Sequence, residues 1–337
     1  MENKKLYNIY DKEYLSKKLH NEQQDRITCS FYKYTPIQNL EILRDHLYEK
    51  LISINVLGRI YIAPEGINAQ FSVPSHKWNH LIELFNSYDS FKNIHIKKAV
   101  KEGKSFLKLK IMIKKEIVAW GLDAEEYDLN KTGVHLNAEE FNALIEKDDT
   151  ILIDMRNNYE SEVGKFENAI CPTSKRSKDL IKETQKILKG KEKQNIAMYC
   201  TGGIRCEKAS SHLIKQGFKN VFQLNGGIIE YANEAKQKGI KSKFIGKNFV
   251  FDDRLGERIT DDIIAKCHLC GNDSDSHTNC KNDACHLLFI ICKQCDQKLM
   301  GCCSLECKEI YKLPIEEQRK IRKKFAKKFK NKFRPRV

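Results

Sequence analysis

The chain has 337 residues, of which 41% are hydrophobic and 31% are charged, and only 17 are Gly and 6 are Pro. This length exceeds one ordinary core, so two or three domains are expected, and the composition excludes a disordered chain. Lys and Arg number 60 against 45 Asp and Glu, a net charge of +15, which favours an anionic partner such as nucleic acid or an acidic membrane surface.

Neither secretion nor membrane insertion is indicated. The first residues, MENKKLYNIYDKEYL, are charged throughout and lack the apolar stretch of a signal peptide. The longest apolar run, Leu287 to Cys292, is far shorter than the roughly 18 residues that span a bilayer. The sequence therefore predicts a cytoplasmic protein whose 13 cysteines are reduced.

Residues 1–125 predict an α+β domain. The order of strand, helix, two strands, helix and strand is typical of a ferredoxin-like two-layer sandwich, in which Gly66 punctuates the hairpin between two central strands. The expected strands are 27–34, 56–64, 67–73 and 94–100, the helices are 37–55 and 75–88, and an extended segment follows at 104–121.

Residues 134–240 predict an α/β domain with a mostly parallel sheet. Short apolar strands alternate with helices, so both faces of the sheet are expected to be covered and the ligand site to lie at the carboxyl ends of the strands. The expected helices are 137–147, 178–190, 206–217 and 227–239, and the strands are 150–155, 195–200 and 220–226. Residues 241–266 form a connector without an assigned element.

A cysteine at the end of one strand is the candidate catalytic residue. The strand at 195–200 ends on Cys200, and a helix is expected to begin near Cys206. The active-site loop between them consists of Thr201, Gly202, Gly203, Ile204 and Arg205. Backbone N–H groups of the turn, the helix dipole and Arg205 all favour a thiolate, which predicts a nucleophile at neutral pH. The alternative is a buried structural cysteine beside glycines that permit a tight turn.

The length of the loop selects among thiol chemistries. A cysteine phosphatase needs five residues between Cys and Arg to surround a phosphate, whereas four residues separate Cys200 from Arg205. The shorter loop suits one extra sulfur on Cys200, a persulfide whose outer atom accepts the backbone N–H bonds.

The central part resembles a rhodanese domain over about 146–240, on the segments ILIDMRNNYE, VGKFENA, CTGGIRCEKAS and VFQLNGGI. The resemblance implies that Cys200 carries the persulfide and that Asp154 and Arg156 end the first strand near the site. An ion pair that only supports the loops is the alternative for Asp154 and Arg156. Cys206 is a candidate for resolving an oxidised Cys200 as a disulfide, or it packs inside the helix.

Nine cysteines between residues 267 and 307 predict a metal-binding module over 267–310. Two CxxC pairs and four further cysteines supply two sets of four thiolates, which suits two structural zinc ions. The expected ligands are Cys267, Cys270, Cys280, Cys285, Cys292, Cys295, Cys303 and Cys307. Cys302 and Cys303 are interchangeable at this stage, and His268, His277 or His286 is an alternative ligand. A disulfide network is the rival reading, and a reducing compartment disfavours it.

Residues 311–337 form a basic tail. From Arg319 to Val337 there are eleven Lys and Arg and no acidic residue. A solvated charged face is one interpretation, and contact with an RNA backbone is the other. The residues expected to bind nucleic acid are Lys323, Lys324, Lys327, Lys328, Lys330, Lys332 and Arg334.

The order of the three parts, with the PEGIN turn, the CTGGIRCEKAS loop and the cysteine-rich segment, resembles the tRNA uridine hydroxylases. The resemblance implies conversion of the wobble uridine of tRNA to 5-hydroxyuridine with molecular oxygen and an essential Cys200. No nucleotide or flavin motif is visible, and neither the electron donor nor the oligomeric state is indicated. Two alternatives are a persulfide sulfurtransferase acting on a small thiol or tRNA, and a non-catalytic RNA-binding adaptor.

Overall fold

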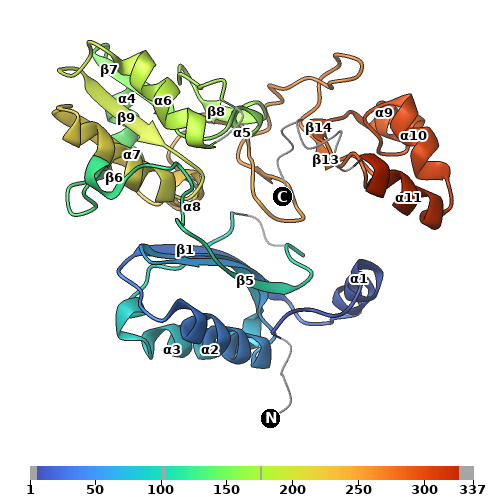
Figure 1. Ribbon diagram of the computed structural model, residues 1–337. Helices are drawn as coiled ribbons and strands as arrows, with labels where there is room; N and C mark the ends of the chain where they lie inside the picture. The colour runs from blue at the N-terminus through green and yellow to red at the C-terminus, as the bar shows by residue number, and fades with distance from the viewer. Residues whose placement is uncertain (1–5, 101–103, 175–176, 326–337) are drawn as a thin grey trace.

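The computed structural model describes residues 6–100, 104–174 and 177–325. The chain forms an N-terminal sheet with two helices on one side, a layered central part, and a small C-terminal part with short helices (Figure 1). The N-terminal elements are α1 (Lys12–His20), β1 (Arg26–Tyr34), α2 (Leu40–Ser53), β2 (Leu57–Ala63), β3 (Gly66–Pro74), η1 (Ser75–Lys77), α3 (Trp78–Asn86), η2 (Asp89–Phe91), β4 (Lys97–Lys98) and β5 (Leu109–Ile113).

The N-terminal sheet has the strand order β4-β1-β3-β2-β5. The first four strands pair antiparallel, whereas β5 runs parallel to β2. Apolar residues that alternate along the strands, such as Phe31 and Ile60, pack with Leu47 of α2 and Phe85 of α3 on one face. This topology confirms the expected ferredoxin-like sandwich. The opposite face of the sheet is turned toward the central part (Figure 1).

Two expected extended segments are much shorter in the structure. Within 94–100 only Lys97 and Lys98 pair with β1, while Ile94 and Ile96 pack against the core from irregular backbone. Within 104–121 only β5 is a strand, and it pairs with residues 58–62 of β2. The large apolar residues of these segments are therefore buried or partly buried as predicted, but the strands are shorter than the pattern predicts.

The central part contains a four-stranded parallel sheet with the order β6-β10-β9-β7. Residues along each strand alternate between two cores, so that Ile153 packs toward α6 and α7 and Leu152 packs toward α4 and α8. This arrangement confirms the expected α/β fold. Its elements are η3 (Ala124–Glu126), β6 (Val134–Leu136), α4 (Ala138–Ile145), β7 (Thr150–Asp154), α5 (Asn158–Ser161), β8 (Gly164–Phe166), α6 (Ser177–Leu188), β9 (Asn195–Tyr199), α7 (Ile204–Lys215), β10 (Asn220–Leu224) and α8 (Gly227–Lys238).

The connector, for which no element is expected from the sequence, contains strands that extend the central part. β11 (Phe244–Asn248) pairs antiparallel with β8 and with β12 (Glu257–Arg258). The residues after β11 then run beside the N-terminal sheet, where Asp253 N donates a hydrogen bond to Ser105 O at 2.9 Å. The connector therefore contacts both larger parts of the molecule.

The C-terminal part is built on a short hairpin and three helices: β13 (His277–Asn279), β14 (Leu288–Ile290), α9 (Lys293–Leu299), α10 (Leu305–Lys312) and α11 (Ile315–Phe325). Cysteines fill its interior with Phe289 and Ile291. A second cluster, which includes Val163, Phe249 and Ile290, attaches the hairpin to the central part and the connector. Within the described ranges, no helix combines the length and the apolar character that a membrane crossing requires.

Candidate active site

The Cys200 loop joins β9 to α7 at the carboxyl edge of the parallel sheet. α7 begins at Ile204 rather than near Cys206 as expected, so Arg205 and Cys206 both lie in its first turn. Gly203 has a φ of 96°, which other residues rarely adopt, and its N–H donates to Cys200 Sγ at 3.1 Å. A Cβ at Gly227 would lie 2.5 Å from Cys200 O, so glycine is also required where α8 approaches the loop.

The surroundings of Cys200 favour its thiolate. Burial opposes ionisation of this thiol, which has no exposed surface. The Cys206 thiol, the Arg205 charge and the backbone N–H groups of Arg205 and Cys206 outweigh burial and lower the pKa of Cys200 to about 5. Burial and the Cys200 thiolate raise the pKa of Cys206 well above its usual value. At neutral pH the pair therefore consists of one thiolate and one thiol.

Arg205 is held by a carboxylate that the sequence analysis did not single out for a role. Its guanidinium donates to both carboxylate oxygens of Glu160, at 2.7 and 2.9 Å, and to Thr201 Oγ1 at 3.2 Å. Burial alone would raise the pKa of Glu160, but Arg205 lowers it. Glu160 comes from α5, forty residues before the loop, so no local spacing marks it as the partner of Arg205. The bidentate pair fixes the cation beside the thiolate.

Asp154 and Arg156 form a separate buried ion pair. The Arg156 guanidinium donates to Asp154 carboxylate oxygens at 2.7 and 2.9 Å, and neither side chain has exposed surface. Tyr199 Oη donates to the same carboxylate at 2.8 Å, and Arg156 also donates to Gly164 O at 2.7 Å. These contacts support the structural interpretation, because the pair ties β7, β9 and β8 together underneath the loop.

A cavity of about 440 Å³ separates the N-terminal sheet from the Cys200 loop. The loop borders it through Thr201, Gly202, Ile204 and Arg205, whereas Cys200 itself is not among the lining residues. The connector closes another side. Side chains of the sheet that face the cavity include Tyr32, Arg59, Tyr61, Asn68, Gln70 and Lys97. In the sequence, this wall of the cavity is marked by polar residues that alternate with the core residues along β1, β2 and β3.

Two tyrosines of β1 fix α7 against the N-terminal sheet. Tyr32 Oη donates to Glu207 Oε1 at 2.8 Å, and Tyr34 Oη donates to Ile204 O at 3.2 Å. Burial, followed by the Glu207 charge, raises the pKa of Tyr32, so this phenol stays protonated and remains a donor. The helix that follows Cys200, α7, is therefore positioned by the N-terminal sheet.

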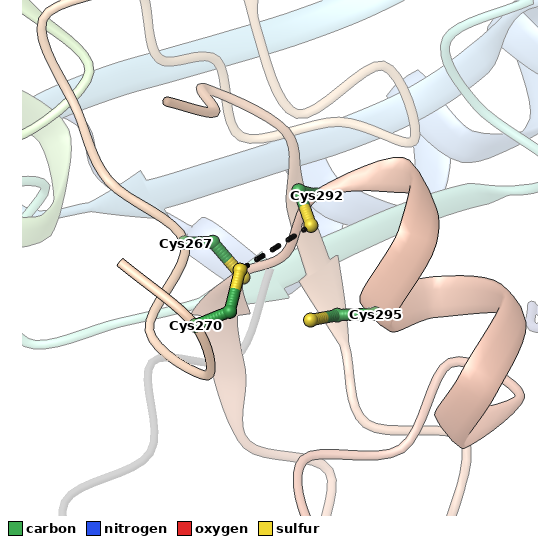
Figure 2. A group of neighbouring side chains, drawn as sticks. All are labelled: Cys267, Cys270, Cys292 and Cys295. Carbon is green, nitrogen blue, oxygen red and sulfur yellow. Dashed lines mark hydrogen bonds between the residues drawn. The ribbon is translucent and has the colours of Figure 1, made fainter. Parts of the chain in front are cut away.

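The eight cysteines expected to bind metal form two groups in the structure. One group contains Cys267, Cys270, Cys292 and Cys295, whose sulfurs point toward one another (Figure 2), and the other contains Cys280, Cys285, Cys303 and Cys307. Within each group all sulfur atoms lie within 4.8 Å of one another. Four sulfurs so arranged are typical of a tetrahedral structural zinc site.

Among the described residues, the two groups contain neither Cys302 nor any of the candidate histidines. Cys302 lies outside both groups, so Cys303 is the member of the second one. No histidine belongs to either group in the described residues, and His268 Nε2 lies 2.6 Å from Glu162 Oε1 instead. All thirteen cysteines are free thiols, so the structure contains no disulfide network.

Little of the expected nucleic-acid contact can be placed. Lys323 is exposed in α11, and Lys324 belongs to the same helix. The remaining residues of this prediction, Lys327, Lys328, Lys330, Lys332 and Arg334, lie outside the described residues.

Comparisons with known proteins cover nearly the whole chain. Family models match residues 26–117 (UPF0176 acylphosphatase like domain), 137–234 (Rhodanese-like domain) and 245–308 (Rhodanase C-terminal). A "tRNA uridine(34) hydroxylase" of Leptospira interrogans is 52% identical over 94% of this chain and 87% of its own length. A protein of the same name from Yersinia enterocolitica is 48% identical over 93% of this chain and 90% of its own length.

Among solved structures, the Alr3790 protein of Anabaena sp. is 20% identical and covers 33% of this chain and 91% of its own, with a TM-score of 0.27.

Proposed function

We propose that this chain, which belongs to the tRNA uridine(34) hydroxylase family, hydroxylates C5 of uridine 34 in tRNA. In this proposal the reaction depends on the Cys200 thiolate, and molecular oxygen is the co-substrate. The observation that carries the proposal is a cysteine whose pKa is lowered to about 5, in a loop that borders a cavity of about 440 Å³. No comparison assigns a role to an individual residue, so the site rests on this geometry.

The cavity suits an everted base. Its volume falls within the roughly 300 to 1,000 Å³ usual for ligand sites, and enzymes that modify a base take it out of the stack into such a pocket. Tyr32 and Tyr61 offer ring surfaces, and Asn68 and Gln70 offer amide groups that can pair with the edge of a pyrimidine. Because Cys200 has no exposed surface, the loop must move aside for contact, and Gly202 and Gly203 give it that freedom.

The electron balance assigns a task to each thiol. One oxygen atom of O₂ replaces the hydrogen at C5 as a hydroxyl group, and the other is taken by the Cys200 thiolate, which gives up two electrons and becomes a sulfenate. The Cys206 thiol then attacks this sulfur, and a Cys200–Cys206 disulfide forms with loss of water. A cellular thiol reductant returns the pair to its starting state. Cys206 lies in the first turn of α7, and its thiol is among the groups that lower the pKa of Cys200, which supports this pairing.

The remaining parts support binding rather than chemistry. The two cysteine groups hold one structural zinc ion each, since a closed set of four thiolates leaves no position for a substrate. The cations of the tail bind the tRNA backbone. A substrate of this kind places the protein in the cytoplasm.

Nucleoside mass spectrometry of cellular tRNA tests the proposal. In a host without a second route to 5-hydroxyuridine, the wild-type gene is expected to restore that nucleoside at position 34, and Cys200→Ser is expected to abolish it. Unchanged levels without the gene would overturn the proposal, and full activity of Cys200→Ser would indicate an adaptor that keeps the fold only as a scaffold.

A sulfurtransferase is the second candidate. The loop with four intervening residues and the lowered pKa of Cys200 equally suit a persulfide carrier. Thiolated rather than hydroxylated tRNA, together with rapid sulfur release from thiosulfate, would favour it.

A further inference from the structure

Lys97 is a buried cation in the wall of the cavity, next to the Cys200 loop. It lies in β4 opposite Ser30, and its side chain is 5% exposed. Its Nζ lies 4.6 Å from the centre of the Tyr32 ring. A Cβ at Gly202 would lie 4.0 Å from Lys97 Cε, and one at Gly226 would lie 3.4 Å from its Cδ. The ammonium group therefore belongs to the part of the cavity nearest the loop.

Lys97 is not neutralised by a direct carboxylate partner. Other buried cations of the described chain are paired: Lys208 binds Glu116 at 2.8 Å, and Arg205 binds Glu160 at 2.7 Å. For the Lys97 ammonium group the structure shows the contact with the Tyr32 ring and neither a hydrogen bond nor an ion pair among the described residues. Removing an ammonium group from water without a partner is costly. A cation kept in this state points to an anionic or strongly polar group of the ligand.

We propose that the Lys97 ammonium donates a hydrogen bond to the C4 carbonyl oxygen of the uracil ring and stabilises negative charge that gathers on this oxygen while C5 reacts. The proposal rests on the proposed function and adds a residue that touches the substrate. The base must place C5 near the Cys200 sulfur in order to react. Because C4 is bonded to C5, the C4 oxygen then also lies near this sulfur, where Lys97 can reach it. A donor that is already in place needs no reorganisation during the reaction.

The same contact distinguishes uracil from cytosine. Cytosine carries an amino group where uracil has the C4 oxygen, and an ammonium group has no acceptor to offer it. Asn68 and Gln70 can adapt to either base because an amide both donates and accepts. Lys97 therefore requires a carbonyl oxygen at the position that it contacts.

The test compares three variants of the full-length protein on a tRNA transcript with uridine at position 34. Lys97→Met keeps the length of the side chain without its charge, and it is expected to lower kcat about 100-fold, as for the loss of one donor to a developing oxyanion. KM for tRNA should change less than about threefold, because a single base contact contributes little to the affinity of a polyanion. Lys97→Arg restores the cation and should recover part of kcat.

Lys98→Met is the matched control. Lys98 is the next residue of β4, is exposed, and lies over the Trp78 ring of α3 instead of lining the cavity. Its variant should keep kcat within about twofold of the wild type. Thermal unfolding separates misfolding from lost chemistry, since removal of an unpaired buried charge should leave the melting temperature of Lys97→Met equal to or above that of the wild type.

The pH profile gives a second readout. Burial lowers the pKa of Lys97, against the charges of Glu230, Cys200 and Glu207. Because the charged form is required, kcat should fall as pH rises through this pKa. The phenol of Tyr32 also faces Lys97, but its pKa is raised, so it does not lose its proton first. In Lys97→Arg the alkaline fall should move to higher pH, since a guanidinium keeps its proton.

Three results would overturn the proposal: Lys97→Met with kcat within about threefold of the wild type, a loss confined to KM, or Lys97→Arg no more active than Lys97→Met. The wild type is measured in the same assay. If it forms no 5-hydroxyuridine, the proposed function fails, whereas an active wild type with an unaffected Lys97→Met rejects only the role of Lys97.

Discussion

The Cys200 loop and the C-terminal cysteine module use the same side chain in opposite ways. In the loop, one buried thiolate is surrounded by N–H donors, a thiol and the Arg205 cation, which lower its pKa to about 5. In the module, the sulfurs of eight cysteines face one another in two groups of four. A lone sulfur stabilised by donors keeps its lone pairs for a reaction, whereas sulfurs gathered in a closed group are committed to a metal ion. The partners of each sulfur decide its function.

Metal removal should have the largest effect. The purified protein is expected to hold two zinc ions, and Cys292→Ser should release at least one, because a structural zinc ion contributes about 10 to 16 kcal/mol to the folding of small modules. Elemental analysis and thermal unfolding measure both effects. Cys302→Ser is the control, since Cys302 is buried in the same module but lies outside both groups. Equal loss of metal from both variants would contradict the assignment.

Neutralising the cation beside Cys200 should have the next largest effect. The variant combines Arg205→Gln with Glu160→Gln, so that loss of the cation leaves no unpaired buried carboxylate. The pKa of Cys200 should then rise from about 5 by about 1 to 3. Because the reaction requires the Cys200 thiolate, the pH below which activity is lost should rise by the same amount. The pH dependence of Cys200 alkylation, followed by peptide mass spectrometry, measures the shift. A midpoint that stays near pH 5 would show that the donors suffice without Arg205.

A smaller effect is expected for Cys206→Ser. The serine hydroxyl can still donate to Cys200, so the first turnover should survive, but an oxidised Cys200 can no longer be resolved. Repeated turnover should fall about tenfold, and a sulfenic acid on Cys200 should become detectable with a dimedone-type label. Undiminished turnover in the variant would remove Cys206 from the cycle.

The smallest effect is expected from the basic tail. Deleting residues 326–337 removes Lys327, Lys328, Lys330, Lys332 and Arg334 together with Arg336. The affinity for tRNA should fall about tenfold near 0.1 M salt and depend less steeply on salt concentration, while kcat at saturating tRNA is retained. Binding titrations at several salt concentrations check this. An unchanged salt dependence would show that the tail makes no backbone contact.

Local patterns in the sequence predicted the two sulfur environments but not what surrounds them. The Cys200 loop and the CxxC pairs are recognisable because their residues are close in sequence, and the apolar periods of the helices and strands were sufficient for the two larger folds. Glu160 reaches the loop from α5 of the central part, and Tyr32 and Lys97 reach it from the N-terminal sheet, so only the tertiary packing reveals them. The sequence does not predict the strands of the connector, because they are short and β11 pairs with β8, which is distant in the sequence.

The proposed reaction transfers one oxygen atom of O₂ to C5 of uridine 34 and depends on Cys200. The most direct measurement is incubation of the purified protein with a U34 tRNA transcript under ¹⁸O₂, followed by nucleoside mass spectrometry. The wild type should form 5-hydroxyuridine that carries one ¹⁸O atom, and Cys200→Ser should form none. A hydroxyl group without the label, a thiolated product, or an equally active Cys200→Ser would contradict the proposed reaction.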